Sequence, residues 1–477
     1  MIDKLRKEIG ISSLSELEMD LWTMMREEFA KMLSSLLEKI DQAIFELRDP
    51  GRYASDGFVT RTMGTMFGQD VSFRRRRYRD CDTGKDVYLL DELLGIERES
   101  QVSPALTSLM LTQAATTNSY RKAAESIAGF LGFRAVSHET VRQTVIRVGK
   151  ELERVSAEQR AEPQGNRKVR VLFVEADGMS VPLQKSKKRR VEEKIVTFHE
   201  GWQPRYAGSK DYKLKCLRQF RSHQAEDFWE EASRAVYSHY DVDENTVVVI
   251  NGDRAHWIRK GVDYFPNAMY QVDRFHLLRD LKLWFGKHSK TYRRLVSALD
   301  SNDPTGIEFL GRLVKAVDKL EGSKYKEALS LIEDLAGMPE AVVDYRIRLR
   351  AQGVSTQGFQ GLGAAESQVK RFSDRIKGPR SWRPNGLSSM MELQRTRHEG
   401  IFYEIVSRLE QWITSESNPS LPVQDAVCSA VRSAAAKMAN ALNAKVPIKN
   451  MGRTGSGGLS HFFHRLNESG MPPITNF

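Results

Sequence analysis

Hydrophobic positions near the start of the chain recur with the spacing of a long helix. Within residues 13–48, leucine, methionine and phenylalanine return every three or four positions, from Leu14 to Ile40. Ser13 and Glu16 have the spacing of a capping box, in which each side chain satisfies a backbone N–H of the first turn. The pattern predicts one helix over 13–48 that serves packing or dimerisation.

The next segment, residues 57–95, is typical of β structure. Glycines divide it into short pieces that contain β-branched and aromatic residues. A basic run lies between Phe73 and Tyr78 and consists of Arg74, Arg75, Arg76 and Arg77. Because a strand alternates its faces, we expect about half of these arginines on each side. Basic groups beside aromatic rings suit a DNA backbone with stacked bases, and a solvated charged strand is the equal alternative.

Residues 104–153 show two helical patterns separated by a short break. The amphipathic stretch SYRKAAESIAGFLG is followed by FRAVS and then by HETVRQTVIRVGKELERV, for which Ser137 is a good N-cap. Helix, turn and capped helix form the helix-turn-helix pattern, whose second helix enters a DNA major groove. Helical hairpins are also common in proteins that bind no DNA. The exposed residues expected at the start of the second helix are His138, Glu139, Arg142 and Gln143.

Two short apolar runs further along the chain end in acidic residues. Residues 169–174 lead to Asp177, and residues 246–250 lead to Asp253. With the strands and helices expected around them, including a third strand from DYKLKCLRQF, the order is β-β-β-α-β-α-β. This order predicts an α/β fold with a ribonuclease-H-like mixed sheet covered by helices. The turn of its first hairpin is basic, and we expect DNA contacts from Lys187, Lys188, Arg189 and Arg190.

The two strand-end acids predict a metal site. Side chains at the ends of neighbouring strands meet at one edge of a sheet, and Mg²⁺ prefers carboxylate oxygen. Asp177 and Asp253 can then share two Mg²⁺ ions, with Mn²⁺ able to replace them, for phosphoryl transfer. Either aspartate alone is more often an ordinary turn residue, but the two together, in this order, favour a site.

After Asp273 the pattern is helical for roughly ninety residues. A glycine-rich segment then leads into a helix with Glu366 near its start, and we expect this glutamate to be the third metal ligand. The alternative is a glutamate that only complements the helix dipole. Lys370 and Arg371 lie one turn further on, where they can reach DNA phosphates.

Composition narrows the class of protein. The 477 residues carry 73 Lys and Arg against 62 Asp and Glu, a net charge of +11 that favours a polyanionic partner. The three cysteines are far apart and form no CxxC pair, which argues against zinc fingers and disulfides and fits a reducing cytosol. The N-terminus has no apolar signal core, and no stretch is apolar enough to span a bilayer.

These motifs together resemble the DDE transposases of bacterial insertion sequences, specifically the Lre-two type group, which is related in layout to Mutator-like transposases. The resemblance spans about residues 170–400 and includes VEADGMSVPLQ, EEKIVTFHEGW, NGDRAHWIRKGVDYFP, DRFHLLRDLK, GAAESQVKRFSDRIKG and SWRPNGLSSMMEL. It implies that Asp177, Asp253 and Glu366 are the catalytic, metal-binding triad. Asp273 and His276 match an auxiliary element of related transposases, and a histidine that only caps the next helix is the equal alternative.

Two features depart from the resemblance. Arg254 stands beside the second acid, where related sequences have a small residue, and it implies either an altered strand geometry or an added phosphate contact. Many relatives also carry a cysteine-rich zinc element near the N-terminus, whereas this region has only Cys81. Either a metal-free β module takes its place or the element is degenerate.

The resemblance implies an enzyme that binds transposon-end DNA, hydrolyses a phosphodiester bond and joins the freed 3′-hydroxyl to target double-stranded DNA. A homodimer or higher oligomer on DNA, located in the bacterial cytoplasm at the nucleoid and without a membrane partner, goes with this function. The alternatives are a domesticated, non-cleaving DNA-binding protein of transposase descent and a ribonuclease-H-like nuclease.

The expected domain organisation is an all-α insertion inside the α/β core, preceded by a mostly helical DNA-binding region. The predicted segments are an N-terminal helical region (1–56), a small basic β module (57–100), the helix-turn-helix (101–160), the first part of the core (165–285), the helical insertion (286–357), the last part of the core with Glu366 (358–415) and a C-terminal region (416–477).

Overall fold

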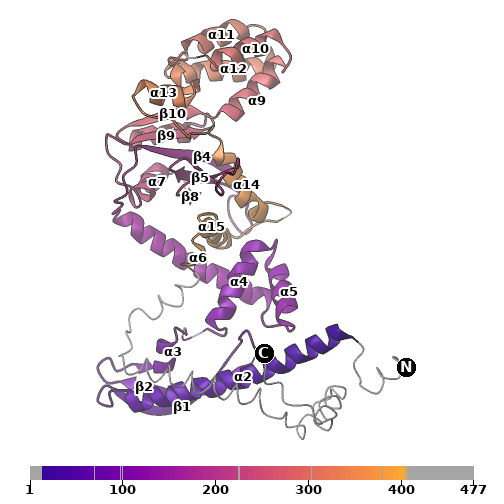
Figure 1. Cartoon of the computed structure of the whole chain (residues 1–477), viewed down its shortest axis with the longest axis vertical. Coiled ribbons are helices and arrows are strands. Elements are labelled where there is room, and N and C mark those ends of the chain that lie inside the picture. The colour runs from indigo at the N-terminus through magenta and orange to yellow at the C-terminus, as the bar shows by residue number, and fades with distance from the viewer. Residues whose placement is uncertain are drawn as a thin grey trace. The chain divides into compact units, whose positions relative to one another are not determined.

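The computed structural model describes residues 13–405 except 69, 97, 99, 224, 225, 302, 379 and 403. The predicted C-terminal region, 416–477, lies outside the described residues. The chain divides into two compact units at Thr144 and Val145, and the second unit ends at Phe402 (Figure 1). The finer division into seven segments stays a prediction.

The first unit begins with the long helix and the β module. Helix α2 (Leu14–Leu47) starts at Ser13, whose hydroxyl accepts the backbone N–H of Glu16, so the predicted helix and cap are confirmed. Strands β1 (Tyr53–Met63) and β2 (Val71–Asp80) are antiparallel, and the short β3 (Asp86–Val87) pairs with β2. Leu37, Ile40 and Ile44 of α2 form a core with residues of this module.

One part of the β module is helical and corrects the prediction. Val87, the first residue of the segment VYLLDELLG, belongs to β3, but Leu89–Leu93 form the short helix α3 instead of a strand. The physical reason is its apolar spacing: Leu89, Leu90 and Leu93 share one helical face and pack against the core that contains Phe73.

The predicted helix-turn-helix segment has the expected elements. Helices α4 (Pro104–Thr116), α5 (Tyr120–Leu131) and α6 (His138–Ala161) follow one another. Helix α5 ends at Gly132, whose φ of 77° is the left-handed conformation that glycine adopts without strain. Ser137 accepts the backbone N–H of Thr140 at 3.0 Å, so its predicted role as the cap of α6 is confirmed.

The second unit is built around a five-stranded mixed sheet. Its strands are β4 (Val171–Pro182), β5 (Arg190–His199), β8 (Arg218–Ser222), β9 (Val247–Gly252) and β10 (Ala268–Val272). The spatial order is β10-β9-β4-β5-β8, in which β10, β9 and β4 are parallel and β5 is antiparallel to both of its neighbours. The mixed α/β class is therefore as predicted.

The third strand begins later in the sequence than predicted. Only the end of DYKLKCLRQF enters the sheet, as the start of β8. Its beginning forms β7 (Tyr212–Leu214), which pairs with β6 (Trp202–Pro204) in a separate two-stranded ribbon.

Helices cover both faces of the sheet. Helix α7 (Phe228–Tyr237), α8 (His256–Arg259) and the 3₁₀ helix η1 (Lys260–Tyr264) contribute to a core with Leu172, Val174 and Ala176 of β4. Because side chains alternate along a strand, Val171 and Phe173 belong to the opposite face, which also packs Tyr345 and Leu349. Helix α14 (Ala364–Ile376) lies along this second face beside β4 (Figure 1).

A helical segment separates the last strand from α14, as predicted. It contains α9 (Arg274–Phe285), α10 (Lys290–Leu299), α11 (Ile307–Val317), α12 (Gly322–Ala336), η2 (Pro339–Val342) and α13 (Tyr345–Ala351). The described second unit ends with α15 (Pro384–His398). A membrane-crossing helix, which needs both length and an apolar sequence, is not found among the described residues.

Candidate active site

A row of buried polar side chains crosses the second face of the sheet. The register aligns one residue of each strand, and we call these five residues the central row: Gln271, Asn251, Glu175, Thr197 and Gln219. All are at most 5% exposed. Polar groups at this depth need hydrogen-bond partners, so this part of the sheet must be organised by specific contacts.

Three aspartates lie two residues beyond the central row. Asp273 and Asp253 directly follow β10 and β9, whereas β4 continues past Asp177 to Pro182, so Asp177 stands where the parallel pairing of β4 ends and not, as predicted, at the end of the strand. We call them the acidic row: Asp273, Asp253 and Asp177. Ala176 of β4 is opposite Gly252 of β9 in the register. Asp177 and Asp253 are the next residues of the two segments, so they are neighbours. Asp273 continues the ladder, since its N–H donates to the Gly252 carbonyl at 2.8 Å. The structure thus brings the two predicted strand-end acids together, with Asp273 beside them.

Asp177 and Asp253 each accept a nearby backbone N–H with one oxygen and keep the other oxygen available. The N–H of Gly178 donates to Asp177 Oδ1 at 2.7 Å, and that of Ala255 donates to Asp253 Oδ1 at 2.9 Å. The other oxygen of each carboxylate accepts no hydrogen bond from the described residues. Burial raises the pKa of Asp177, and the negative charge of Asp253 raises it further. A cation would relieve this repulsion.

Asp273 and His276 form a pair at the start of α9. Asp273 caps the helix, because its Oδ1 accepts the N–H of His276 at 2.9 Å, and the imidazole Nδ1 lies 3.0 Å from the same oxygen. This contact raises the pKa of His276. Burial acts to raise the pKa of Asp273, but the contacts with His276 outweigh it and lower that pKa. The cap of α9 is therefore Asp273 and not His276, and the charge of His276 acts to lower the pKa of Asp177.

Glu175 of the central row anchors the helix that carries the third predicted acid. Its Oε2 accepts the N–H groups of Gly363, Ala364 and Ala365 at 2.8, 2.8 and 3.4 Å. The first turn of α14 has no side-chain cap of its own, since Gly363 stands at the N-cap position. A carboxylate at a helix N-terminus is favoured by the unpaired N–H groups and the helix dipole.

Further contacts hold the Glu175 carboxylate from the sheet side. Asn251 Nδ2 donates to Oε2 at 3.0 Å, and His199 Nε2 lies 3.1 Å from Oε1. Both partners are fully buried. Glu175 thus joins strands β4, β5 and β9 to the start of α14 and fixes the position of that helix over the sheet.

The exposed Glu366 lies in the first turn of α14. Gln368 faces the opposite way, because its Oε1 accepts Gln219 Nε2 of β8 at 3.4 Å. Residues two apart on a helix point about 200° from each other, so Glu366 lies on the opposite side of α14 from Gln368. Ser373 is seven residues further on, on the same flank, and contacts the Met179 sulfur of β4 at 3.7 Å.

The three acids do not form a ready-made cluster. Over the part of the chain that the structure describes, no group of three or more His, Cys, Asp or Glu side chains is placed to hold a metal ion. The close pair is Asp177 with Asp253, and Glu366 extends from a neighbouring helix.

Arg254 serves the fold next to the acidic row. Its guanidinium lies 3.7 Å from Asp280 of α9 and 3.4 Å from Asp334 of α12, and Arg259 also pairs with Asp334 at 3.0 Å. Arg254 therefore ties the end of β9 to the helical segment. Its charge is balanced there, so the structure gives no support to the predicted phosphate contact.

The other predicted basic residues of this unit lie on the surface. The turn between β4 and β5 exposes Lys187, Lys188 and Arg189, and Arg190 opens β5 with its guanidinium 2.8 Å from the Ser180 hydroxyl. Lys370 is exposed on α14. The Arg371 guanidinium is less available for a DNA contact, because it donates to Gln368 Oε1 at 3.0 Å.

The arginine run of β2 divides into buried and exposed members. Arg75 is buried and pairs with Asp91 of α3, and Arg76 pairs with Asp41 of α2 at 2.7 Å. These two residues hold the module together, which corrects their assignment as DNA contacts. Arg77 pairs with Asp56 at 2.6 Å and is partly exposed. Arg74 is exposed over the ring of Phe58, the arrangement predicted for a nucleic-acid contact.

One glutamate binds the two residues of α6 that are candidates for contacts with DNA bases. Glu139 accepts Arg142 Nη2 at 2.6 Å and Gln143 Nε2 at 2.9 Å. These hydrogen bonds lower the pKa of Glu139 to about 2. His138 is exposed at the first position of the helix. Arg142 and Gln143 are thus positioned together, and base contact would require them to leave Glu139.

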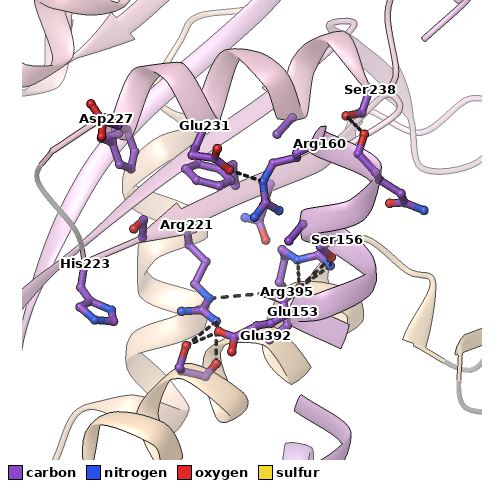
Figure 2. A pocket seen from close by; sticks show the side chains of 18 of the residues that line it. Glu153, Ser156, Arg160, Arg221, His223, Asp227, Glu231, Ser238, Glu392 and Arg395 are labelled. Atoms are coloured by element: carbon purple, nitrogen blue, oxygen red, sulfur yellow. Dashed lines mark hydrogen bonds and ion pairs between the residues drawn. The ribbon is translucent and has the colours of Figure 1, made fainter. Parts of the chain in front are cut away.

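A cavity of about 1050 Å³ lies along β8, the edge strand far from β9 and β10. Its charged groups pair with one another: Arg221 donates to Glu153 at 2.6 Å, Arg160 to Glu231 at 2.8 Å and Arg395 to Glu392 at 2.6 Å (Figure 2). Burial acts to raise the pKa of Glu392, but the charges of Arg395 and Arg221 lower it to about 2. This network connects α6, β8 and α15 and has no contact with the acidic row.

Three residues of the site were missed by sequence reasoning: Glu175, His199 and Asn251. The signal for Glu175 was present, because it shares the face of Asp177 and stands in an otherwise apolar strand. A charged residue at a fully buried strand position needs partners. No comparable signal marks His199 or Asn251, since their role depends on the register between strands.

The fold and site define a mixed α/β protein with neighbouring carboxylates on adjacent parallel strands and an N-terminal unit of helices and a small sheet. A family model described as uncharacterised, UPF0236, matches residues 8–411, so the chain belongs to the UPF0236 family. A relative from Streptococcus gallolyticus, named a UPF0236 protein in the vanSb 3′ region, is 28% identical over 399 residues, which cover 82% of this chain and 84% of the relative.

A second relative comes from Caldanaerobacter subterraneus subsp. tengcongensis. It is 26% identical over 366 residues, which cover 76% of this chain and 73% of the relative, and its name joins eleven locus designations under one UPF0236 protein. Another UPF0236 protein of the same organism is 25% identical over 366 residues, with 76% and 73% covered, and its name joins four designations.

Proposed function

We propose that the protein is a DDE transposase that cleaves DNA at the ends of a mobile element and joins them to target double-stranded DNA. The observation that carries the proposal is the placement of Asp177 of β4 next to Asp253, which directly follows β9, with Glu366 in the first turn of α14, a helix that packs on β4. Strand transfer and hydrolysis are both in-line displacements at phosphorus, and paired carboxylates suit that chemistry.

The sheet supports this proposal. The order β10-β9-β4-β5-β8, with β5 antiparallel, is the one expected for a ribonuclease-H-like core. Asp253 and Asp273 stand at the carboxyl ends of parallel strands, where α/β sheets place their sites, and Asp177 lies beside them in β4. The helical segment between β10 and α14 is the expected all-α insertion.

The donor set fits Mg²⁺ or Mn²⁺. Asp177 and Asp253 offer hard oxygen atoms whose mutual repulsion a cation relieves, and Glu366 would complete the set. A bound divalent ion supplies Lewis acidity toward the phosphate and a more acidic attacking water.

The chain's own residues would position the reaction. Glu175 fixes α14, and with it Glu366, relative to β4. Asp273 keeps His276 charged over a wider pH range, and the imidazolium presents a positive group beside Asp177 that can meet a DNA phosphate. Exposed basic residues, among them Lys187 and Lys370, would hold the DNA backbone.

The names of two relatives also support a mobile element. One joins eleven locus designations and another joins four, as expected where one gene is present in many copies in a genome. A protein that copies or moves its own gene produces this pattern. The same proposal includes assembly of at least two copies on DNA, at the nucleoid of a bacterial cytoplasm.

Incubation of the purified protein with a labelled duplex from the DNA that flanks its gene tests the proposal. With Mg²⁺ or Mn²⁺ and a target plasmid, we expect cleavage that leaves a 3′-hydroxyl at the element end, followed by joined products. Binding without cleavage would indicate a non-cleaving DNA-binding protein. Cleavage without joining would indicate a nuclease.

A further inference from the structure

A second cavity, of about 470 Å³, lies on the central-row face beside the acidic row. Asn251 and Gln271 line it from β9 and β10, and Tyr345 and Phe359 line it from the segment before α14. Asn251 is two residues from Asp253, so one wall of the cavity belongs to the strand that carries a proposed catalytic acid. The volume lies in the range of small-ligand sites.

Two buried acceptors of this cavity have no partner among the described residues. Asn251 Nδ2 donates to Glu175 and Asp273, and Gln271 Nε2 donates to the Ala341 carbonyl at 2.9 Å, which fixes the orientation of both amides. The amide oxygens, Asn251 Oδ1 and Gln271 Oε1, accept no hydrogen bond. Asn251 is fully buried and Gln271 is 5% exposed. An unpaired acceptor at this depth costs about 1–3 kcal/mol, which a donating ligand would recover.

The rim of the cavity carries an excess of positive charge. Arg274 pairs with Asp300, and Arg346 pairs with Asp344 at 2.6 Å. Arg350 is exposed and has only a hydrogen bond to the Thr356 hydroxyl at 3.2 Å among the described residues. The cavity therefore combines aromatic rings and hydrogen-bond acceptors with a cationic rim.

We propose that this cavity receives one nucleotide turned out of the DNA strand, with its base inside and its phosphate at Arg350. The inference rests on the proposed function for the choice of DNA as the ligand. An exocyclic amino group of adenine, cytosine or guanine would donate to Asn251 Oδ1 or Gln271 Oε1, and the base would contact Phe359. An amino group carries two N–H donors for the two unpaired acceptors, whereas thymine has only the single donor at N3, so the site favours a base with an amino group.

Binding of mononucleotides to the full-length protein tests this assignment without any DNA cleavage. We expect deoxyadenosine monophosphate to bind at least about fivefold tighter than thymidine monophosphate, because the adenine amino group has two N–H donors for the two unpaired acceptors and thymine has only N3–H. Gln271→Met should remove most of this preference. Arg350→Gln, at an exposed position that does not threaten folding, should remove the advantage of the monophosphate over deoxyadenosine.

Equal binding of the two nucleotides to the wild-type protein would overturn the assignment, and so would full displacement of deoxyadenosine monophosphate by inorganic phosphate. An unchanged nucleotide affinity in Arg350→Gln would remove the phosphate contact and contradict the proposed pose. The result is separable from the proposed function. A protein that binds the nucleotide but cuts no DNA would support the nucleotide site and contradict the proposed transposase function. A protein that cuts DNA without binding the nucleotide would contradict only the nucleotide site.

Discussion

Glu175 Oε2, in the middle of β4, accepts the backbone N–H of Ala364 at 2.8 Å, at the first position of α14. The two residues are 189 positions apart in the chain. This hydrogen bond connects the strand that delivers Asp177 to the helix that delivers Glu366. A buried carboxylate thus serves as the N-cap that the helix lacks, and the position of one predicted acid relative to another depends on it.

Replacement of Glu175 by Gln should destabilise the second unit and impair the site together. The amide keeps the size of the side chain but loses the charge that three N–H groups and two side chains approach. We expect a loss of roughly 2–4 kcal/mol in the free energy of unfolding, measured by chemical denaturation. Glu244→Gln, an exposed substitution at the other end of β9, is the matched control. A variant as stable as wild type would show that Glu175 does not anchor α14.

The contact between Glu139 and Arg142 predicts opposite effects of two substitutions on DNA binding. Arg142→Ala should weaken binding to the element end by roughly 1–3 kcal/mol if the guanidinium reads a base. Glu139→Gln should tighten binding, because it frees Arg142 and removes a negative charge near DNA. A gel-shift titration on end DNA and on unrelated DNA separates the cases. Equal losses on both for Arg142→Ala indicate a phosphate contact, and no loss on either would contradict the helix-turn-helix assignment.

The different burial of the β2 arginines predicts that one substitution lowers the stability of the protein and another lowers its affinity for DNA. Arg75→Ala leaves Asp91 buried with one partner fewer and should cost roughly 3 kcal/mol of stability. Arg74→Ala removes an exposed group, so stability should change by less than about 0.5 kcal/mol while affinity for DNA falls. Thermal melts and gel shifts of the two variants give the comparison. Reduced DNA binding without reduced stability in Arg75→Ala would contradict the buried ion pair.

The burial of His398 predicts that the folded protein loses stability at acidic pH. It is buried against Phe372, and burial, followed by the charges of Arg371 and Arg397, lowers the pKa of His398 to about 3. The folded state therefore prefers the neutral ring. Its stabilising contribution is complete above the unfolded pKa near 6.5 and is lost as the pH falls toward 3, with about 2 kcal/mol lost by pH 5. His398→Phe should lack this component in denaturant titrations at pH 7.5 and 5.0, and an identical pH dependence in both proteins would contradict it.

The sequence predicted those parts of the fold that depend on local pattern. Helix α2 with its Ser13 cap, the Ser137 cap and the alternation of apolar runs with acids could be read from spacing alone. Contacts across strands could not. The partners of Glu175, and the burial of Arg75 against Asp91, depend on register and on packing between distant segments. The same limit explains the wrong prediction for α3. Its leucines are compatible with a strand or a helix, and packing against the core determines which one forms.

Cleavage of a labelled element-end duplex by Asp177→Asn, Asp253→Asn and Glu366→Gln, with Glu244→Gln as control, tests the central claim most directly. Each of the three variants removes one charge and one oxygen donor with little change in size. The account predicts that each lowers the cleavage rate at least roughly a hundredfold, while affinity for the duplex stays within about twofold of wild type and the control cuts normally. Wild-type cleavage rates in any of the three variants would contradict the account.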